Sequence, residues 1–293
     1  MKLNSVRRMS TLTLLLMVCI AAHGETTNKF ASPESVLFDQ SHFYVSNVGE
    51  KLNPTAEDGD GYISLVDTKG NIIEQKYFDI PLNAPKGMAI DNNILYVADI
   101  NRVVGLDVKT RQKILEVSLK DQNVSFLNDI AIDKNGILYV SATDTGEIYQ
   151  INPRLTADEA PASRLPIKKI PGPNGLVYDA QTHSLWIASF GSGNAQKGEL
   201  GKLDVASLHY EKVTDVSGML DGIAIKDNNT VLVSDWVAFD NSGRIIEIDL
   251  ATGTQKVLAN QIGGPADFVY ISESKQLVIP RMIESRISFQ SLN

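Results

Sequence analysis

The residues most able to do chemistry in this chain occupy one slot of a pattern repeated six times. The pattern is a first-slot residue that is polar in five copies, then a small residue and three apolar residues, and four copies continue with Asp. The first slots are, in chain order, Glu34, Lys86, Asn128, Asn174, Asp221 and Ala266. Two carboxylates and two amide carbonyls make an all-oxygen set that suits a hard cation such as Ca²⁺. If the fold gathers them, these slots predict a site for Ca²⁺ or another divalent cation, with water completing its shell.

The spacing of the copies indicates how these side chains come together. Successive first slots are 52, 42, 46, 47 and 45 residues apart. A period in this range is typical of repeat architectures. A closed repeat brings equivalent positions around one axis, so Glu34, Asn128, Asn174 and Asp221 should point toward a shared centre.

Each copy continues in the same way, with a short turn and a second apolar run such as Leu138-Tyr139-Val140. Runs rich in β-branched and aromatic residues between turn residues predict strands joined by hairpins. A third, alternating strand and a fourth, more polar one follow in most copies. This increase in polarity from the first strand to the fourth predicts an all-β, six-bladed β-propeller with four-stranded blades. A stacked solenoid is the alternative, but it would need terminal caps that the sequence does not show.

The sixth copy ends after residues 286–289 and lacks a fourth strand. Residues 25–31 are available to supply it. Such an exchange would cover an unpaired strand edge and join the two ends of the chain. We therefore expect the N-terminal strand to close the last blade.

The first 24 residues have the character of a secretory signal peptide. Three basic residues precede an apolar stretch over 12–22, and small residues follow it. The stretch is short for a membrane span, and an uncleaved anchor is the alternative. We divide the chain into a signal peptide, 1–24, and a propeller, 25–293, and expect export to the periplasm or the medium.

Charge and cysteine content narrow the classes of partner. The formal net charge of −8 becomes −11 without the predicted signal, which carries three basic and no acidic residues. Nucleic acid and anionic membranes are therefore unexpected partners. The single cysteine, Cys19, lies in the signal, so the propeller must rely on its core and on ring closure.

Other roles for the slot residues stay open at this stage. A polar residue before a strand often caps a turn, and Asn174-Gly175 is a common turn pair. Lys86 has three candidate roles: to pair with Glu34, to orient a substrate, or to weaken metal binding. The three histidines outside the signal fall in turns or outer segments, which argues against zinc or iron. These histidines are His42, His183 and His209.

A second layer of residues is expected at the same mouth, where the second strands end. The long loops that start there in blades one, four and five suit a substrate entrance. Trp236 and Phe239 would either wall an apolar pocket or pack under their own loop. The residues we assign to the entrance are Asp99, Asp235, Trp236, Arg281 and Phe126.

At these residues the chain resembles the gluconolactonase, senescence-marker-protein and luciferin-regenerating-enzyme family. The resemblance implies a six-bladed propeller with a divalent metal, commonly Ca²⁺, in its channel. Asn174-Gly175 is similar to the family's metal-binding Asn, and Asp221-Gly222 to its metal-binding Asp and proposed base. Glu34 matches the first-blade metal ligand. Asn128 matches a substrate- or water-binding Asn, and we also count it among the candidate ligands.

The chain also departs from that family. Pro33 precedes Glu34, whereas the family usually has a Pro soon after this Glu. Sugar-acid lactonases often carry a basic residue where this chain has Phe126, and Lys86 is unlike them too. The related paraoxonase-like lactonases use a histidine pair near the metal, and no histidine is available here.

The sequence therefore predicts an exported, metal-dependent hydrolase of a lactone or related ester. Asp221 would ligate the metal and take a proton from the attacking water. Asn128 would hold the substrate or the water, and Lys86 or Arg281 would bind a carboxylate or leaving oxygen. The alternative is a non-catalytic propeller that binds a ligand or a protein, with a structural metal or none.

Overall fold

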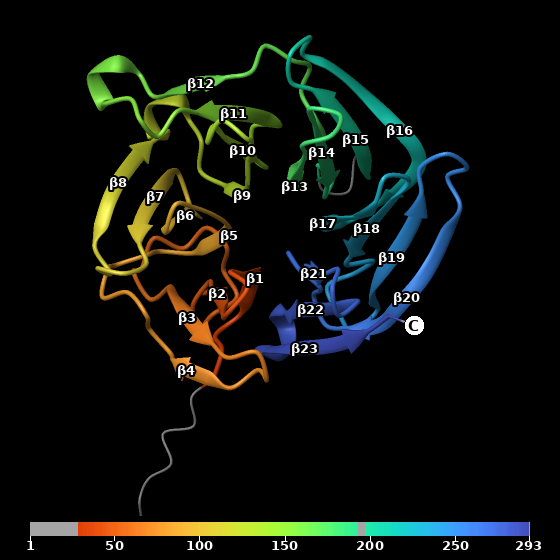
Figure 1. Ribbon diagram of the computed structural model, residues 1–293, viewed down its shortest axis with the longest axis horizontal. Helices are drawn as coiled ribbons and strands as arrows, with labels where there is room; N and C mark the ends of the chain where they lie inside the picture. The colour runs from red at the N-terminus through yellow and green to blue at the C-terminus, as the bar shows by residue number, and fades with distance from the viewer. Residues whose placement is uncertain (1–28, 193–196, 293) are drawn as a thin grey trace, which may run out of the picture.

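The computed structural model describes residues 29–192 and 197–292, which form six small antiparallel sheets around a central axis (Figure 1). Blade one contains β1 (Pro33–Phe38), β2 (Phe43–Asn47), β3 (Tyr62–Val66) and β4 (Ile72–Glu74). Blade two contains β5 (Pro85–Asp91), β6 (Ile94–Asp99), β7 (Arg102–Asp107) and β8 (Lys113–Ser118). Blade three contains β9 (Leu127–Ile132), β10 (Leu138–Ala142), β11 (Glu147–Ile151) and β12 (Ala162–Arg164).

The second half of the chain repeats this order. Blade four contains β13 (Pro173–Asp179), β14 (Ser184–Ser189), β15 (Gly198–Asp204) and β16 (His209–Gly218). Blade five contains β17 (Leu220–Asp227), β18 (Thr230–Asp235), β19 (Gly243–Asp249) and β20 (Gln255–Ile262). Blade six contains β21 (Val269–Ile271), β22 (Gln276–Arg281) and β23 (Arg286–Ser291). The described helices are single 3₁₀ turns at Lys120–Gln122, Ala157–Glu159 and Met282–Glu284.

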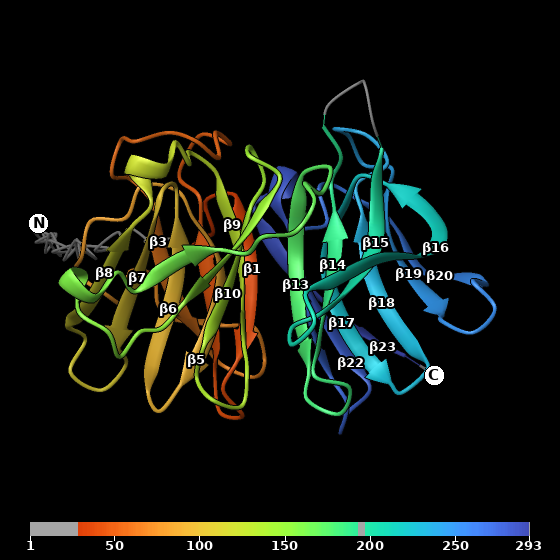
Figure 2. The same ribbon diagram turned by 90° about the horizontal axis from the view of Figure 1, so that it is seen from above.

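The architecture confirms the predicted six-bladed propeller. Within each blade the strands pair in chain order, and the first strand lies nearest the axis (Figure 1). Seen from the side, the strands run between the two faces of a disc (Figure 2). The first strands of neighbouring blades contact one another, so the slot at the start of each strand opens on one face.

Burial follows the predicted gradient from the axis outward. Every residue of β2, β10 and β14 is buried, whereas β8 and β20 are mostly exposed or half-buried. The core lies between blades, as in the cluster that joins Tyr96 and Val103 of blade two to Ile130 and Leu138 of blade three. Inner strands are therefore apolar on both faces, and outer strands meet water on one.

The small residue in the second slot allows the inner strands to approach closely. A Cβ atom added to Gly175 would lie 2.1 Å from the backbone oxygen of Asp221 in the next blade. One added to Gly222 would lie 2.7 Å from the Cα of Asp267. These two contacts between blades therefore require glycine.

The described residues do not show the predicted closure of blade six by an N-terminal strand. In the part of the chain that the structure describes, the sixth sheet has three strands. The Ala31 and Ser32 carbonyls accept hydrogen bonds from Gly49 and Val48 of blade one, instead of adding a strand to β23. Residues 25–28 of the expected strand lie outside the described residues.

The ring closes instead at its inner strands. Ser35 bridges Asp267 in parallel register, and Val36 N–H donates to the Asp267 carbonyl at 3.1 Å. Phe30 adds an apolar side chain to the cluster that contains Val36 of blade one and Val278 of blade six. Side-chain packing thus joins the first and last blades where we had expected a complete fourth strand.

The predicted signal, 1–24, lies outside the described residues. Within residues 29–192 and 197–292, no helix is long and apolar enough to cross a membrane.

Candidate functional site

A β-bulge aims the slot residue toward the axis in each of the first five blades. The register between first and second strands shifts across Pro33–Val36 in blade one and Pro173–Leu176 in blade four. Equivalent shifts occur in blades two, three and five. A bulge leaves residues out of the ladder and turns their side chains, which is a common device beside functional sites. The repeated slot is thus the bulge itself.

Serine hydroxyls of the second strands support the bulged backbone in three blades. Ser141 Oγ accepts the Asp129 N–H at 2.9 Å and donates to the Asn174 carbonyl of the next blade at 2.7 Å. Ser234 Oγ accepts the Gly222 N–H at 2.7 Å and donates onward to the Ala266 carbonyl. These bonds connect neighbouring slots and keep them in register.

Four slot side chains present buried oxygens without a hydrogen-bond partner. The side chains of Glu34, Asn128, Asn174 and Asp221 are on residues only 3–4% exposed. Five such orphaned side-chain atoms occur in the described part of the chain, and four of them are Glu34 Oε2, Asn128 Oδ1, Asn174 Oδ1 and Asp221 Oδ1. Buried acceptors are normally satisfied. We call these four side chains the rim. A bound cation or a hydrogen-bond donor there would give all four oxygens a partner.

The four slot residues line one cavity of about 170 Å³ at the mouth of the channel. Lys86 and Phe126 line it as well. The structure therefore brings together all five polar slot residues that the repeat predicted, Glu34, Lys86, Asn128, Asn174 and Asp221.

Burial dominates the electrostatics of this rim. It raises the pKa of Asp221 to about 7, while the side chains of Trp236 and Asn174 oppose the rise. The pKa of Glu34 lies well above its ordinary value, first because of burial and then because Asp221 and Asp267 repel a second charge. Uncompensated carboxylates at this depth favour their neutral forms. A bound cation would reverse that preference.

Two further carboxylates, Asp129 and Asp267, lie in the second slots of blades three and six. Asp129 is buried and Asp267 half-buried, and burial raises the pKa of Asp129 to about 6 and that of Asp267 well above its usual value. Asp129 Oδ2 accepts the Leu176 N–H at 2.6 Å, and Asp267 accepts the Ser35 hydroxyl. These bonds give both groups structural partners, unlike the orphaned oxygens of the rim.

Lys86 brings a fully buried cation to the site. Its Nζ donates to the Ala84 carbonyl at 2.9 Å and lies 5.0 Å from the centre of the Phe126 ring. Burial lowers the pKa of Lys86 to about 8, although the charges of Glu34 and Asp99 oppose this. One N–H is committed to Ala84, which leaves two for a ligand.

Trp236 connects the rim to the wall of the cavity. Its indole Nε1–H donates to Asp221 Oδ2 at 2.8 Å, so one oxygen of Asp221 is fixed and the other, Oδ1, is the orphan. Phe190 and Phe239 pack against the indole, with ring centres 6.0 and 5.5 Å away. Both Trp236 and Phe239 line the cavity, in agreement with the pocket-wall alternative.

Three of the five predicted entrance residues do not line the cavity. Asp99 is fully buried, accepts the Asn83 and Ala84 N–H groups and pairs with Arg102 at 2.8 Å. Its carboxylate therefore holds the backbone before β5 in place. Of the predicted set, Trp236 and Phe126 are the two that reach the cavity.

Asp235 and Arg281 have similar structural partners. Asp235 accepts the Met219 N–H and pairs with Arg244 at 2.8 Å. Arg281 donates to Glu284 and to the Gln261 carbonyl. Arg281 therefore has no position from which to bind a leaving oxygen in the cavity, contrary to the role we had expected.

The cavity residues that the sequence interpretation missed in the second layer lie one position further along the chain, where it had chosen only Trp236. The residue immediately after each second strand is apolar in five of the six blades. These residues are Val48, Ile100, Thr143, Phe190, Trp236 and Met282. The last four line the cavity, and the first two pack beneath it with Trp236 and Met282. Side chains alternate between the two faces of a strand. The prediction used the last residue of the second strand, which points to the opposite face.

Whether these residues suit a metal ion depends on the type of ligand atom that they offer. Among residues 29–192 and 197–292, no group of three or more His, Cys, Asp or Glu side chains is placed to hold a metal. Half of the rim's orphaned oxygens belong to Asn, so the rim is a mixed carboxylate and amide set. Carboxylate and carbonyl oxygens are ordinary Ca²⁺ ligands. The residues present fit a hard divalent cation.

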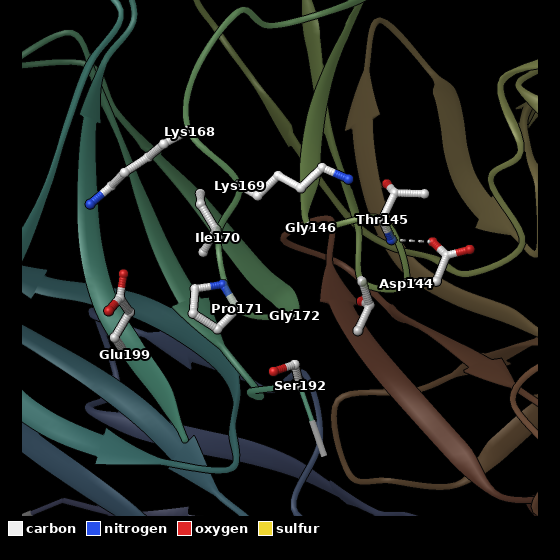
Figure 3. A pocket seen from close by; sticks show the side chains of 11 residues that line it. Asp144, Thr145, Gly146, Lys168, Lys169, Ile170, Pro171, Gly172, Ser192 and Glu199 are labelled. Atoms are coloured by element: carbon white, nitrogen blue, oxygen red, sulfur yellow. Dashed lines mark hydrogen bonds between the residues drawn. The ribbon is translucent and has the colours of Figure 1, made fainter. Parts of the chain in front are cut away.

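A second hollow, of about 420 Å³, lies between blades three and four (Figure 3). Its walls are polar, with Lys168, Lys169 and Glu199 on its sides, and the Thr145 N–H donates to Asp144 at 3.0 Å. It shares Thr143 with the channel cavity and contains none of the slot residues. The candidate site is therefore the channel cavity.

Comparison with solved structures places the chain among propeller proteins. An inactive histidine-to-alanine variant of virginiamycin B lyase from Staphylococcus aureus, with quinupristin, has a TM-score of 0.59 at 16% identity, over 91% of this chain and 97% of that one. Hydrazine synthase of Kuenenia stuttgartiensis has a TM-score of 0.61 at 17% identity, over 93% and 79%. A streptogramin B lyase structure has a TM-score of 0.59 at 14% identity, over 92% and 95%.

At these identities the likeness shows the fold alone. No family model matches the sequence, and no curated protein is detectably similar to it. The family resemblance of the rim residues therefore remains a prediction.

Proposed function

We propose that this protein is an exported, metal-dependent hydrolase that opens a lactone or cleaves a related ester. The observation that carries the proposal is the set of four orphaned, buried oxygens on Glu34, Asn128, Asn174 and Asp221, which share one cavity. A purely structural ring of turn caps would have its polar atoms satisfied. This one keeps four acceptors free at a mouth where a ligand can enter.

These four side chains would hold the cation, with Ca²⁺ as the first candidate and another divalent cation as the alternative. A divalent cation bound there would polarise the substrate carbonyl and favour the oxyanion. The protein's own contribution is a rigid rim, because the bulges and the serines of the second strands fix the backbone on which the ligands stand.

Asp221 is the residue best placed to move a proton. Its Oδ2 is fixed by the Trp236 indole, and its Oδ1 faces the site without a partner. A bound cation would keep Asp221 ionised, and an ionised carboxylate can accept a proton from water. As water adds to the carbonyl carbon, its proton would pass to Asp221 Oδ1.

Asn128 and Lys86 would act on the substrate. The amide of Asn128 would orient the substrate or the attacking water. The ammonium group of Lys86 keeps two N–H donors free and would give a proton to the leaving oxygen as the ester C–O bond breaks. Arg281, committed to Glu284, drops out of this role.

The resemblance to gluconolactonase-like enzymes supports the same assignment of Glu34, Asn174 and Asp221. The lyases among the structural neighbours suggest a different chemistry. The inactive lyase variant replaces a histidine, and no histidine lines this cavity in the described part of the chain. The hydrolase is therefore the better supported of the two.

Localisation and partners belong to the same proposal. The predicted signal supports export, periplasmic or secreted, and the acidic chain argues against nucleic acid as a partner. The expected partner is a small lactone or ester, and no membrane span is expected after signal removal.

The test begins with purified protein lacking residues 1–24, stripped with a chelator and melted with and without Ca²⁺, Mg²⁺ or Zn²⁺. We expect Ca²⁺ to raise the melting temperature and to be required for turnover of a panel of lactones and aryl esters. Bound-metal analysis before stripping identifies the native ion. Metal-dependent melting without any turnover would favour the non-catalytic binding propeller, and melting indifferent to every cation would remove the metal site.

Asp221→Asn should abolish metal-dependent turnover and leave a folded protein. Asp227→Asn is the matched control, because Asp227 ends the same strand, β17, at its exposed opposite end. Full activity in the Asp221 variant would show that the proton passes elsewhere.

A further inference from the structure

The wall of the cavity differs chemically from its floor. Oxygen donors and Lys86 form the floor, and above them every residue except Thr143 is apolar. Phe126 packs against Lys86, and we call the rest of this wall the apolar cage, whose members are Leu52, Pro54, Phe190, Trp236, Phe239 and Met282. They come from the loops after the second strands of blades one, four, five and six.

Three aromatic rings form a rigid corner of the cage. Phe190, Trp236 and Phe239 pack in a triangle, with ring centres 5.5 to 6.1 Å apart. The Trp236 indole is held by Asp221, so this corner stands directly beside the proposed base. A group that rests against the rings would have its reacting carbonyl at the rim.

The outer members of the cage are left exposed to water. Phe239 is 72% exposed and Leu52 is 42% exposed, from loops of two different blades. Trp236, deeper in the wall, is 4% exposed. Large apolar side chains gathered around an opening are typical of a binding site that a ligand covers.

The volume limits what the cage can hold. The cavity of about 170 Å³ is close to the size of a protein cavity, roughly 150 Å³, that accepts benzene. It therefore has room for one ring or for a short alkyl chain. A long acyl chain would have to extend past Phe239 into solvent.

The cage offers almost no partners for hydroxyl groups. Thr143 is its one polar neighbour, and its hydroxyl already donates to the Pro173 carbonyl at 2.8 Å. A sugar lactone would leave several hydroxyls buried without partners, which is unfavourable for binding. An apolar substituent would instead gain from leaving water.

We propose that the substrate carries an uncharged apolar substituent, a short alkyl chain or a single aromatic ring, that the apolar cage binds. The proposal rests on the hydrolase function proposed above and names its substrate class. Phe239 is then a specificity-determining residue that contacts the substituent without touching the reacting carbonyl.

The test uses three lactones with the same six-membered ring. These are δ-valerolactone, δ-nonalactone, which adds a butyl chain, and δ-gluconolactone, which adds hydroxyls. We expect kcat/KM for δ-nonalactone to exceed that for δ-gluconolactone at least tenfold, with δ-valerolactone between them. Equal or better turnover of δ-gluconolactone would overturn the cage proposal and leave the hydrolase standing.

Phe239→Ser should raise KM for δ-nonalactone at least threefold and change that for δ-valerolactone little. Phe239 is largely exposed, so the variant should fold. Val257→Ser is the control, because Val257 is 47% exposed on β20, away from the cavity. An unchanged KM in the Phe239 variant would contradict the assignment of the cage.

A binding measurement separates the cage from the chemistry. The matching δ-lactams keep the ring and carbonyl but resist hydrolysis. The chain has two tryptophans, so Trp186→Phe leaves Trp236 as the fluorescent reporter. The butyl lactam should change Trp236 emission at a concentration at least tenfold lower than the unsubstituted lactam. This result without turnover of any lactone would support the cage and refute the hydrolase, whereas equal affinities for the two lactams would refute the cage.

Discussion

Replacing Asp221 by Asn should change the stability of the metal-free protein in a way that depends on pH. The substitution keeps the shape of the side chain and an acceptor for the Trp236 indole, but removes the charge. Asp221 is buried, the charge of Asp129 hinders its ionisation, and the charge of Asp221 in turn hinders that of Glu34. The neutral variant should therefore be more stable than the parent wherever Asp221 would be ionised and no cation is present.

The magnitude follows from the pKa of Asp221, which burial raises from 3.8 to about 7. A raised pKa means that the folded state holds the proton more tightly than the unfolded chain. The stability from that proton is complete below about pH 4 and is lost as the pH rises through 7. A pKa difference of about three corresponds to roughly 4 kcal/mol. At about 2–4 °C per kcal/mol, the variant should melt roughly 8–16 °C above the parent at pH 8 in chelator.

The assay is a thermal melt at pH 4 and pH 8, in chelator and in Ca²⁺. At pH 4 the parent and Asp221→Asn should melt together, because both side chains are neutral. At pH 8, Ca²⁺ should raise the melting temperature of the parent much more than that of the variant. Asp227→Asn should match the parent throughout, since an amide oxygen can still accept the Asn229 N–H. A variant less stable than the parent at pH 8 in chelator, or with the parent's full response to Ca²⁺, would refute the reasoning.

Two further predictions test the frame that holds the rim. Gly175→Ala places a methyl group 2.1 Å from the Asp221 backbone oxygen, so blades four and five must separate. We expect a loss of about 2–3 kcal/mol in the free energy of unfolding, measured by denaturant titration, and weaker Ca²⁺ binding by calorimetry. Ser234→Ala leaves the Gly222 N–H and the Ala266 carbonyl without their hydroxyl partner. It should cost about 1–3 kcal/mol in the same titration, and a loss under 0.5 kcal/mol in either variant would contradict the assigned contact.

The rim could be predicted from the sequence because the six copies of the repeat can be aligned with one another. Six copies in one chain identify equivalent positions, and closure brings equivalent positions together. The structure places Glu34, Asn128, Asn174 and Asp221 around one cavity, as the slot pattern required. The bulge that turns these side chains inward was not expected, although the polar and small pair interrupting each first strand is its sequence signal.

The wall of the site was harder to predict, because it depends on register. Asp99 and Asp235 end their strands with acidic side chains, which suggested an entrance. Both carboxylates instead bind backbone N–H groups and an arginine. In blades three to six the next residue lines the cavity, and in three of these four blades it is apolar, as a core residue would be. Neighbouring residues of a strand point to opposite faces, so the exact end of each strand must be known before the residue that lines the cavity can be predicted.

The described residues do not form the fourth strand that was predicted for blade six. A missing fourth strand in the last copy suggested an exchange with the N-terminus. Among the described residues, the contacts that join the first and last blades lie at the inner strands. Phe30 and Val36 pack with Val278, and the Ser35–Asp267 bridge joins the inner strands. A propeller that closes at its axis keeps the slot ring complete, and the geometry of the candidate site depends on the inner strands alone.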